Sequence, residues 1–144
     1  MAEHFLAAAS AASRLRRRAM AQVKVLLVDD EQDFVQTLAR RLRRRNFEVR
    51  TATDGRYALE LIRQDVPDIV VVDLHMPGID GTELIGRMKA LYPDINVVVL
   101  TGEPWGQKVG DALRLGALGC LEKPLNFSLL TDLIKTAAVS GRAE

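Results

Sequence analysis

Four short apolar runs constrain the fold of this chain more than any other feature. Each lacks polar alternation and is bounded by turn residues: 23–28, 69–72, 97–100 and 117–121. Such runs are typical of parallel strands covered on both faces. Polar groups follow the runs: the pair Asp29 and Asp30, then Asp73, Thr101 and Lys123. Because ligands bind at the carboxyl ends of strands in an open parallel sheet, we expect these side chains to converge on one site.

The apolar pattern predicts strands that alternate with helices. The expected strands are residues 23–28, 47–52, 69–73, 96–101 and 118–122, and the expected helices are residues 32–45, 55–64, 81–91, 104–115 and 127–139. Such alternation is typical of βαβ units with right-handed crossovers. The sequence therefore predicts an α/β fold, a flavodoxin-like, doubly wound five-stranded parallel sheet in the order 2-1-3-4-5 with five helices. Its site would lie where the strand order reverses, between the first and third strands.

Local signals predict where several helices begin. Asp54 and Asn126 precede the second and fifth helices, where their side chains can accept hydrogen bonds from unpaired N–H groups. Pro104 suits the first turn of the fourth helix. The first helix carries an apolar stripe that recurs every four residues and should face the core: Phe34, Leu38 and Leu42.

The expected site combines three carboxylates, one hydroxyl and one ammonium. The clustered carboxylates repel one another, and oxygen ligands of this kind suit Mg²⁺. With the lysine they carry a formal charge of −2, which one Mg²⁺ ion would cancel. A carboxylate oxygen could then attack a phosphoryl group while Mg²⁺, Lys123 and the Thr101 hydroxyl neutralise its oxygens. Each residue also has a simpler interpretation, the acids and the threonine as local caps and the lysine as a solvated loop residue.

Four stretches of the chain resemble the receiver domain of two-component response regulators. They are VLLVDDE at residues 25–31, VVDLHMPGIDG at 71–81, VVLTG at 98–102 and GALGCLEKP at 116–124. The resemblance extends over roughly residues 23–138. It implies the same fold and a function in phosphoryl signalling.

The resemblance also assigns roles to individual residues. It implies that Asp73 is the phosphoacceptor and that Thr101 and Lys123 assist the transfer. Mg²⁺ would be handled by the acidic pair, with the second acid as the more direct ligand, and by two further groups. The implied metal set is Asp29, Asp30, Asp73 and the backbone carbonyl of His75.

Two positions of this chain are unusual or specific to it within the receiver pattern. Three residues before the lysine, receivers usually carry a Tyr or Phe whose ring changes orientation on phosphorylation, whereas this chain has Cys120 at that switch position. A thiol has no ring to reorient, so we expect a small core residue rather than a redox sensor, and we expect Thr101 to report phosphorylation. His75 and Glu103 could border the path of a hydrolytic water; the alternative is an exposed loop histidine without a role.

Five arginines crowd the end of the first predicted helix: Arg40, Arg41, Arg43, Arg44 and Arg45. We expect this positive patch close to the acidic site. It is either a solvated face, with cations favoured at a helix C-terminus, or a docking surface for an acidic partner. Nucleic acid is the less favoured partner.

Composition favours one globular domain. The 144 residues are 48% hydrophobic and 27% charged, with a formal net charge of +1. The single cysteine excludes an intrachain disulfide and fits a reducing compartment, so we expect a cytoplasmic protein. No apolar stretch reaches the roughly 18 residues that span a bilayer.

The chain ends differ from its centre. Residues 1–22 are rich in Ala and Ser and then basic, with four arginines between positions 14 and 18. We expect a disordered extension, or an upstream start before Met20; a basic docking arm or a transit-like segment is the alternative. A secretory signal is disfavoured because its charges would precede the apolar segment. We expect the receiver domain at residues 23–139, a tail at 140–144 and no output domain.

The predicted function is a Mg²⁺-dependent phosphoacceptor switch rather than an enzyme. A histidine kinase or histidine phosphotransfer protein would phosphorylate Asp73, and an unnamed downstream protein would receive the signal. One alternative is a receiver-like interaction module that does not depend on phosphorylation. The other is an aspartyl-phosphate phosphatase of the haloacid dehalogenase type, which is disfavoured because His75, and not an acid, lies two residues after Asp73.

Overall fold

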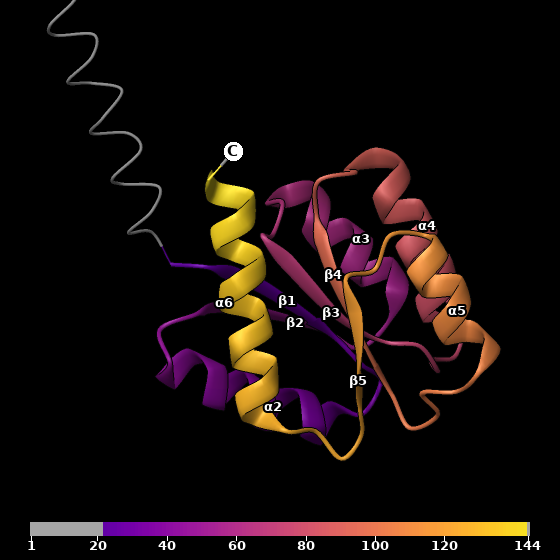
Figure 1. The fold of residues 1–144 in the computed structure, drawn as a ribbon, viewed down its shortest axis with the longest axis horizontal. Helices are drawn as coiled ribbons and strands as arrows, with labels where there is room; N and C mark the ends of the chain where they lie inside the picture. The colour runs from indigo at the N-terminus through magenta and orange to yellow at the C-terminus, as the bar shows by residue number, and fades with distance from the viewer. Residues whose placement is uncertain (1–21, 144) are drawn as a thin grey trace, which may run out of the picture.

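The computed structural model describes residues 22–143. Five parallel strands form one sheet in the predicted order β2-β1-β3-β4-β5 (Figure 1). The strands are β1 (Lys24–Val28), β2 (Glu48–Ala52), β3 (Ile69–Asp73), β4 (Asn96–Thr101) and β5 (Gly119–Glu122). Because β1 lies between β2 and β3, the strand order reverses there and the switch point lies at the carboxyl ends of β1 and β3.

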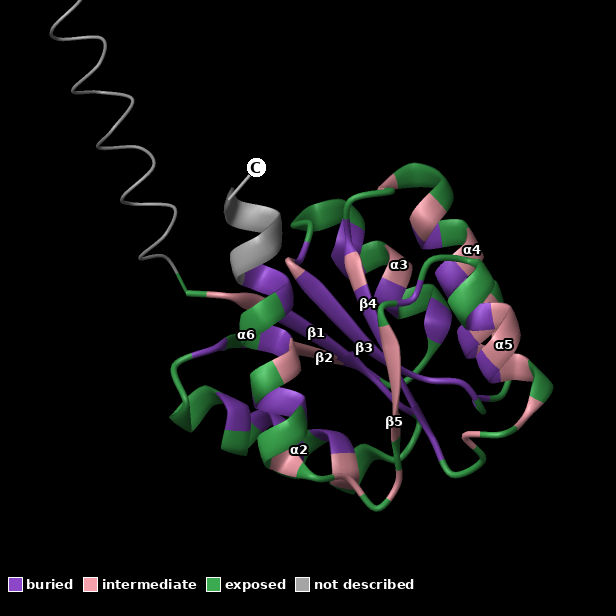
Figure 2. Cartoon of the chain, in the orientation of Figure 1, coloured by how far each residue is buried: buried purple, intermediate pink, exposed green. Residues whose placement is uncertain are grey.

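Helices cover both faces of the sheet (Figure 1). They are α2 (Gln32–Arg44), α3 (Gly55–Gln64), α4 (Gly81–Leu91), α5 (Gln107–Arg114) and α6 (Phe127–Ala143). Alternate strand residues separate into two apolar clusters: Val25 and Leu27 pack with α2 and α6, whereas Leu26 and Val28 pack with α3, α4 and α5. Burial of the central strands on both faces explains their unbroken apolar sequence (Figure 2).

Two predicted helix caps are confirmed and one predicted start is wrong. Asp54 accepts a hydrogen bond from the Tyr57 N–H at 2.9 Å, and Asn126 accepts one from the Leu129 N–H at 3.1 Å. Pro104 does not begin a helix, because α5 starts at Gln107. The Gly106 N–H donates instead to the Glu103 carbonyl at 3.0 Å, so a turn comes before the helix.

The last helix is longer than predicted. It continues through the predicted end at residue 139 to Ala143, and no proline interrupts it there. The expected disordered extension lies, apart from Gln22, outside the described residues. Across residues 22–143, no helix is both long and apolar enough to cross a bilayer.

The arginine patch is not close to the acidic site. Helix α2 begins just after the acidic pair, and its 13 residues extend for about 20 Å. The arginines therefore lie toward its far end. Several also have partners within the chain: Arg41 lies over the Phe127 ring at 3.9 Å, and Arg43 donates to the Val49 carbonyl at 2.9 Å.

Candidate functional site

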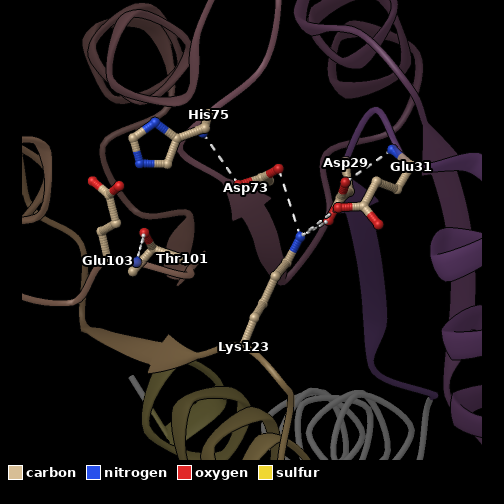
Figure 3. Close-up of polar contacts among 7 residues, drawn as sticks. All are labelled: Asp29, Glu31, Asp73, His75, Thr101, Glu103 and Lys123. Atoms are coloured by element: carbon tan, nitrogen blue, oxygen red, sulfur yellow. Dashed lines mark hydrogen bonds and ion pairs between the residues drawn. The ribbon is translucent and has the colours of Figure 1, made fainter.

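The carboxyl ends of the strands bring the predicted site residues together (Figure 3). Carboxylate oxygens of Asp29, Asp30 and Asp73 all lie within 4.8 Å of one another. The Lys123 side chain, which follows β5, reaches the cluster: its Nζ lies 2.7 Å from Asp29 Oδ2 and 3.6 Å from Asp73 Oδ2. Four residues from three separate strand ends therefore form one charged cluster.

Asp29 is buried and both of its carboxylate oxygens accept hydrogen bonds. Oδ1 accepts from the Glu31 N–H at 3.0 Å, and Oδ2 accepts from Lys123 Nζ. The N-cap of α2 is Glu31, and no side chain caps the helix, so Asp29 is not a simple helix cap. Asp30 is exposed, which leaves its carboxylate accessible to a metal ion.

Asp73 is buried at the end of β3 and is only partly compensated. Burial raises the pKa of its carboxyl group, and the nearby charges of Asp29 and Asp30 raise it further. The His75 N–H, which donates to Asp73 Oδ1 at 3.1 Å, and the Lys123 ammonium act in the opposite direction. A divalent cation beside Asp73 would supply the positive charge that these groups lack.

Lys123 remains an ammonium within this cluster. Burial acts to lower its pKa, but the hydrogen bond to Asp29 and the charges of Asp73 and Glu31 outweigh burial and raise it. Glu31 Oε1 lies 3.6 Å from Nζ, so a fourth carboxylate belongs to the site. The sequence interpretation missed this role of Glu31, although the third acid in the Asp-Asp-Glu run was a visible signal.

Thr101 is fully buried at the end of β4 and is connected to the loop that follows. Its hydroxyl oxygen accepts a hydrogen bond from the Glu103 N–H at 3.0 Å, and its carbonyl accepts from the Lys123 N–H at 2.9 Å. In the view of Figure 3, His75 and Glu103 lie on the side of Asp73 away from Glu31. Both side chains are exposed.

Cys120 is half-buried and packs against the apolar cluster under α3, α4 and α5. Burial, with the negative charge of Glu122, raises the pKa of the thiol. A thiol that stays protonated at neutral pH is a poor nucleophile, which favours the interpretation as a small packing residue.

Two known proteins are similar to this chain in sequence. Sporulation initiation phosphotransferase F of Bacillus subtilis is 29% identical over 116 residues, which are 81% of this chain and 94% of that protein. The transcriptional regulatory protein ZraR of Escherichia coli is 36% identical over 115 residues, 80% of this chain but only 26% of ZraR.

Solved structures show the same fold. Chemotaxis protein CheY4 of Vibrio cholerae superposes with a TM-score of 0.75 at 33% identity, over 81% of this chain and 99% of that chain. The signal receiver domain of an HD domain-containing protein from Pseudomonas fluorescens gives 0.81 at 27% identity, over 85% and 99% of the two chains. The sequence model of the response regulator receiver domain matches residues 25–135. The chain thus belongs to the receiver domain family of two-component response regulators.

Proposed function

We propose that this receiver domain is a Mg²⁺-dependent phosphoacceptor switch, and that Asp73 takes a phosphoryl group from a phosphohistidine protein. The donor would be a histidine kinase or a histidine phosphotransfer protein. The observation that carries the proposal is the position of Asp73, a buried carboxylate within 4.8 Å of two further acids and 3.6 Å from an ammonium. Strand ends at a topological switch point are where such folds bind ligands.

The described residues fit a bound Mg²⁺ ion. Asp30, Asp73 and the backbone carbonyl of His75 would hold it, with Asp29 beside them. Asp30 is the better direct ligand than Asp29, because both oxygens of Asp29 already accept hydrogen bonds. When bound, Mg²⁺ would offset the clustered negative charge and stabilise charge on the phosphoryl oxygens.

The chain's own residues would then carry the transfer. A carboxylate oxygen of Asp73 attacks the phosphorus atom, and the bond to the donor imidazole nitrogen breaks. Lys123 is within reach of the phosphoryl oxygens at Asp73 and would bind one of them. The Thr101 hydroxyl oxygen accepts a hydrogen bond from the Glu103 N–H, so the hydroxyl hydrogen remains available to donate to a second phosphoryl oxygen. Attack of water on phosphorus would later release phosphate and restore Asp73.

The experiment is labelling with radioactive acetyl phosphate, in Mg²⁺ and in EDTA. We expect the parent protein and an Asp132→Asn control to take label in Mg²⁺ alone, and Asp73→Asn to take none. Steady release of phosphate from p-nitrophenyl phosphate would instead indicate a phosphatase. Absence of both activities would favour the interaction module that does not depend on phosphorylation, the alternative that Cys120 keeps open.

We also propose that residues 23–139 act as one receiver unit in the cytoplasm and pass the signal to a downstream protein. A single cysteine suits that reducing compartment. Its function would be regulatory, because the phosphorylation state of Asp73 would carry the signal and no product would be made from a substrate.

A further inference from the structure

The Lys123 ammonium contacts an aromatic ring as well as carboxylates. Its Nζ lies 2.7 Å from Asp29, 3.6 Å from both Asp73 and Glu31, and 4.7 Å from the centre of the Phe34 ring. A cation within about 6 Å of a ring centre is attracted by the ring face. The lysine side chain is only 20% exposed, so this attraction acts in a partly dry environment.

Phe34 is placed for this contact by the start of α2. It is the third residue of the helix, which begins immediately after the acid pair and Glu31. Leu38 and Leu42 of the same stripe are buried, whereas Phe34 is half-buried and packs against the edge of their cluster. Packing alone would be satisfied by a leucine here, but only an aromatic ring offers the lysine a π face.

The ammonium has a competing position. Glu31 is 67% exposed, and a lysine has a flexible four-carbon stem. Without the Phe34 ring beside it, Nζ could follow the Glu31 carboxylate outward into water and away from Asp73. The ring of Phe34 opposes this movement because it attracts the cation and excludes water from one side of it.

We infer that Phe34 is a positioning residue, whose ring holds the Lys123 ammonium beside Asp73 where the phosphoryl oxygens would lie. The inference rests on the proposed function, because it concerns the lysine that assists phosphoryl transfer. Phe34 touches no reacting atom and acts only through Lys123.

The test compares Phe34→Leu with Phe34→Tyr, which keeps the ring, and with Phe127→Leu. Phe127 belongs to the same apolar cluster but contacts Arg41 and Arg45 instead of Lys123. The measurement is the initial rate of acetyl phosphate labelling in saturating Mg²⁺, with thermal melts to report stability. We expect Phe34→Leu to label about 5-fold more slowly, as loss of a partly desolvated cation–π contact predicts, while Phe34→Tyr and Phe127→Leu keep the parent rate.

A double-mutant cycle separates positioning from structural damage. In a Lys123→Met background, Phe34→Leu should have no further effect, because the ring then has no ammonium to hold. An equal fall with and without the lysine, or a parent rate in Phe34→Leu, overturns the inference alone. A parent protein that takes no label overturns the proposed function and this inference with it.

Discussion

Asp29 and Asp73 have the same side chain but different hydrogen-bond environments. Both oxygens of Asp29 accept strong hydrogen bonds, one of them from Lys123 at 2.7 Å. Asp73 accepts one backbone N–H, and its nearest cation is 3.6 Å away. Asp29 is therefore held as a partner for the lysine, whereas Asp73 keeps an oxygen that can react.

Asp80, at the start of α4, has a lowered pKa, whereas the pKa of Asp73 is raised. It accepts from the Glu83 N–H at 3.0 Å and the Thr82 hydroxyl at 2.7 Å, and it pairs with Lys108 at 3.3 Å. Burial acts to raise the pKa of Asp80, but these three donors outweigh burial and lower it. Because the folded-state pKa is depressed, the ionised group stabilises the fold above its unfolded pKa, and this contribution is lost as the pH falls through the folded pKa.

We predict that Asp80→Asn, which keeps the cap, lowers the free energy of unfolding at pH 7 by about 0.5–1 kcal/mol. The difference should shrink below about pH 4, where an unfolded Asp becomes protonated. Urea unfolding of both proteins from pH 7 to pH 3 measures it, with Lys108→Gln as the matched control that removes the same ion pair. If the two proteins differ in free energy of unfolding by the same amount at pH 3 as at pH 7, the effect comes from a weakened helix cap and not from the charge of Asp80.

Helix α4 packs against the end of β3 through a glycine, Gly81. A Cβ atom on Gly81 would lie 2.6 Å from the Asp73 carbonyl oxygen and 2.7 Å from Leu74 Cα. Both are backbone atoms, so a side chain there would force the helix and the strand end apart. The position of Asp73 therefore depends on the start of the next helix.

Gly81→Ala should destabilise the protein by about 2 kcal/mol or more through this overlap. Gly86, in the same helix, has open space around it, and its replacement by Ala should stabilise by up to about 1 kcal/mol. Chemical denaturation of the two variants makes the comparison, since the same substitution is made in the same helix. Equal effects of the two changes would contradict the close packing.

The loop between β4 and α5 connects Thr101 to the only tryptophan of the chain. The Thr101 hydroxyl accepts a hydrogen bond from the Glu103 N–H, and the Glu103 carbonyl accepts one from the Gly106 N–H. Trp105 lies between Glu103 and Gly106 in the chain, and its side chain is 79% exposed. A shift of the hydroxyl toward a phosphoryl group would disturb the first bond of this series. The loop is thus placed to report the state of Asp73.

We predict that phosphorylation, or a Mg²⁺–beryllofluoride mimic, changes the fluorescence of Trp105. Thr101→Ala should reduce the change because it removes the hydroxyl that pulls on the loop, and Cys120→Ser should leave most of it. Steady-state emission spectra measure both variants. Loss of the signal in Cys120→Ser with retention in Thr101→Ala would show that the switch runs through the thiol position.

The sequence predicted the sheet order and the convergence of the acids, Thr101 and Lys123 on one edge of the sheet. It could do so because polar groups followed uninterrupted apolar runs. The contacts of Lys123 with Glu31 and Phe34 were not predictable, since they depend on how α2 packs against the loop after β5. The start of α5 was also missed, because Pro104 suits a turn and a first helical turn equally well.

We predict that Mg²⁺ binding at the carboxylate cluster stabilises the folded protein. At Mg²⁺ concentrations about ten times the dissociation constant, linkage predicts a gain of about 1.4 kcal/mol. Asp30→Ala should remove most of this response and raise stability in EDTA, because it relieves repulsion among the carboxylates. Thermal melts in Mg²⁺ and EDTA provide the measurement, and a parent melt that ignores Mg²⁺ would contradict the site.

The proposed function depends on one claim, that Asp73 itself carries the phosphoryl group. Borotritide reduces an aspartyl phosphate to homoserine, so it marks the acceptor after acetyl phosphate treatment, and peptide sequencing then locates the tritium. We predict tritiated homoserine at position 73 in Mg²⁺ and none in EDTA. Tritium at Asp29 or Asp30, or at no aspartate, would contradict the claim.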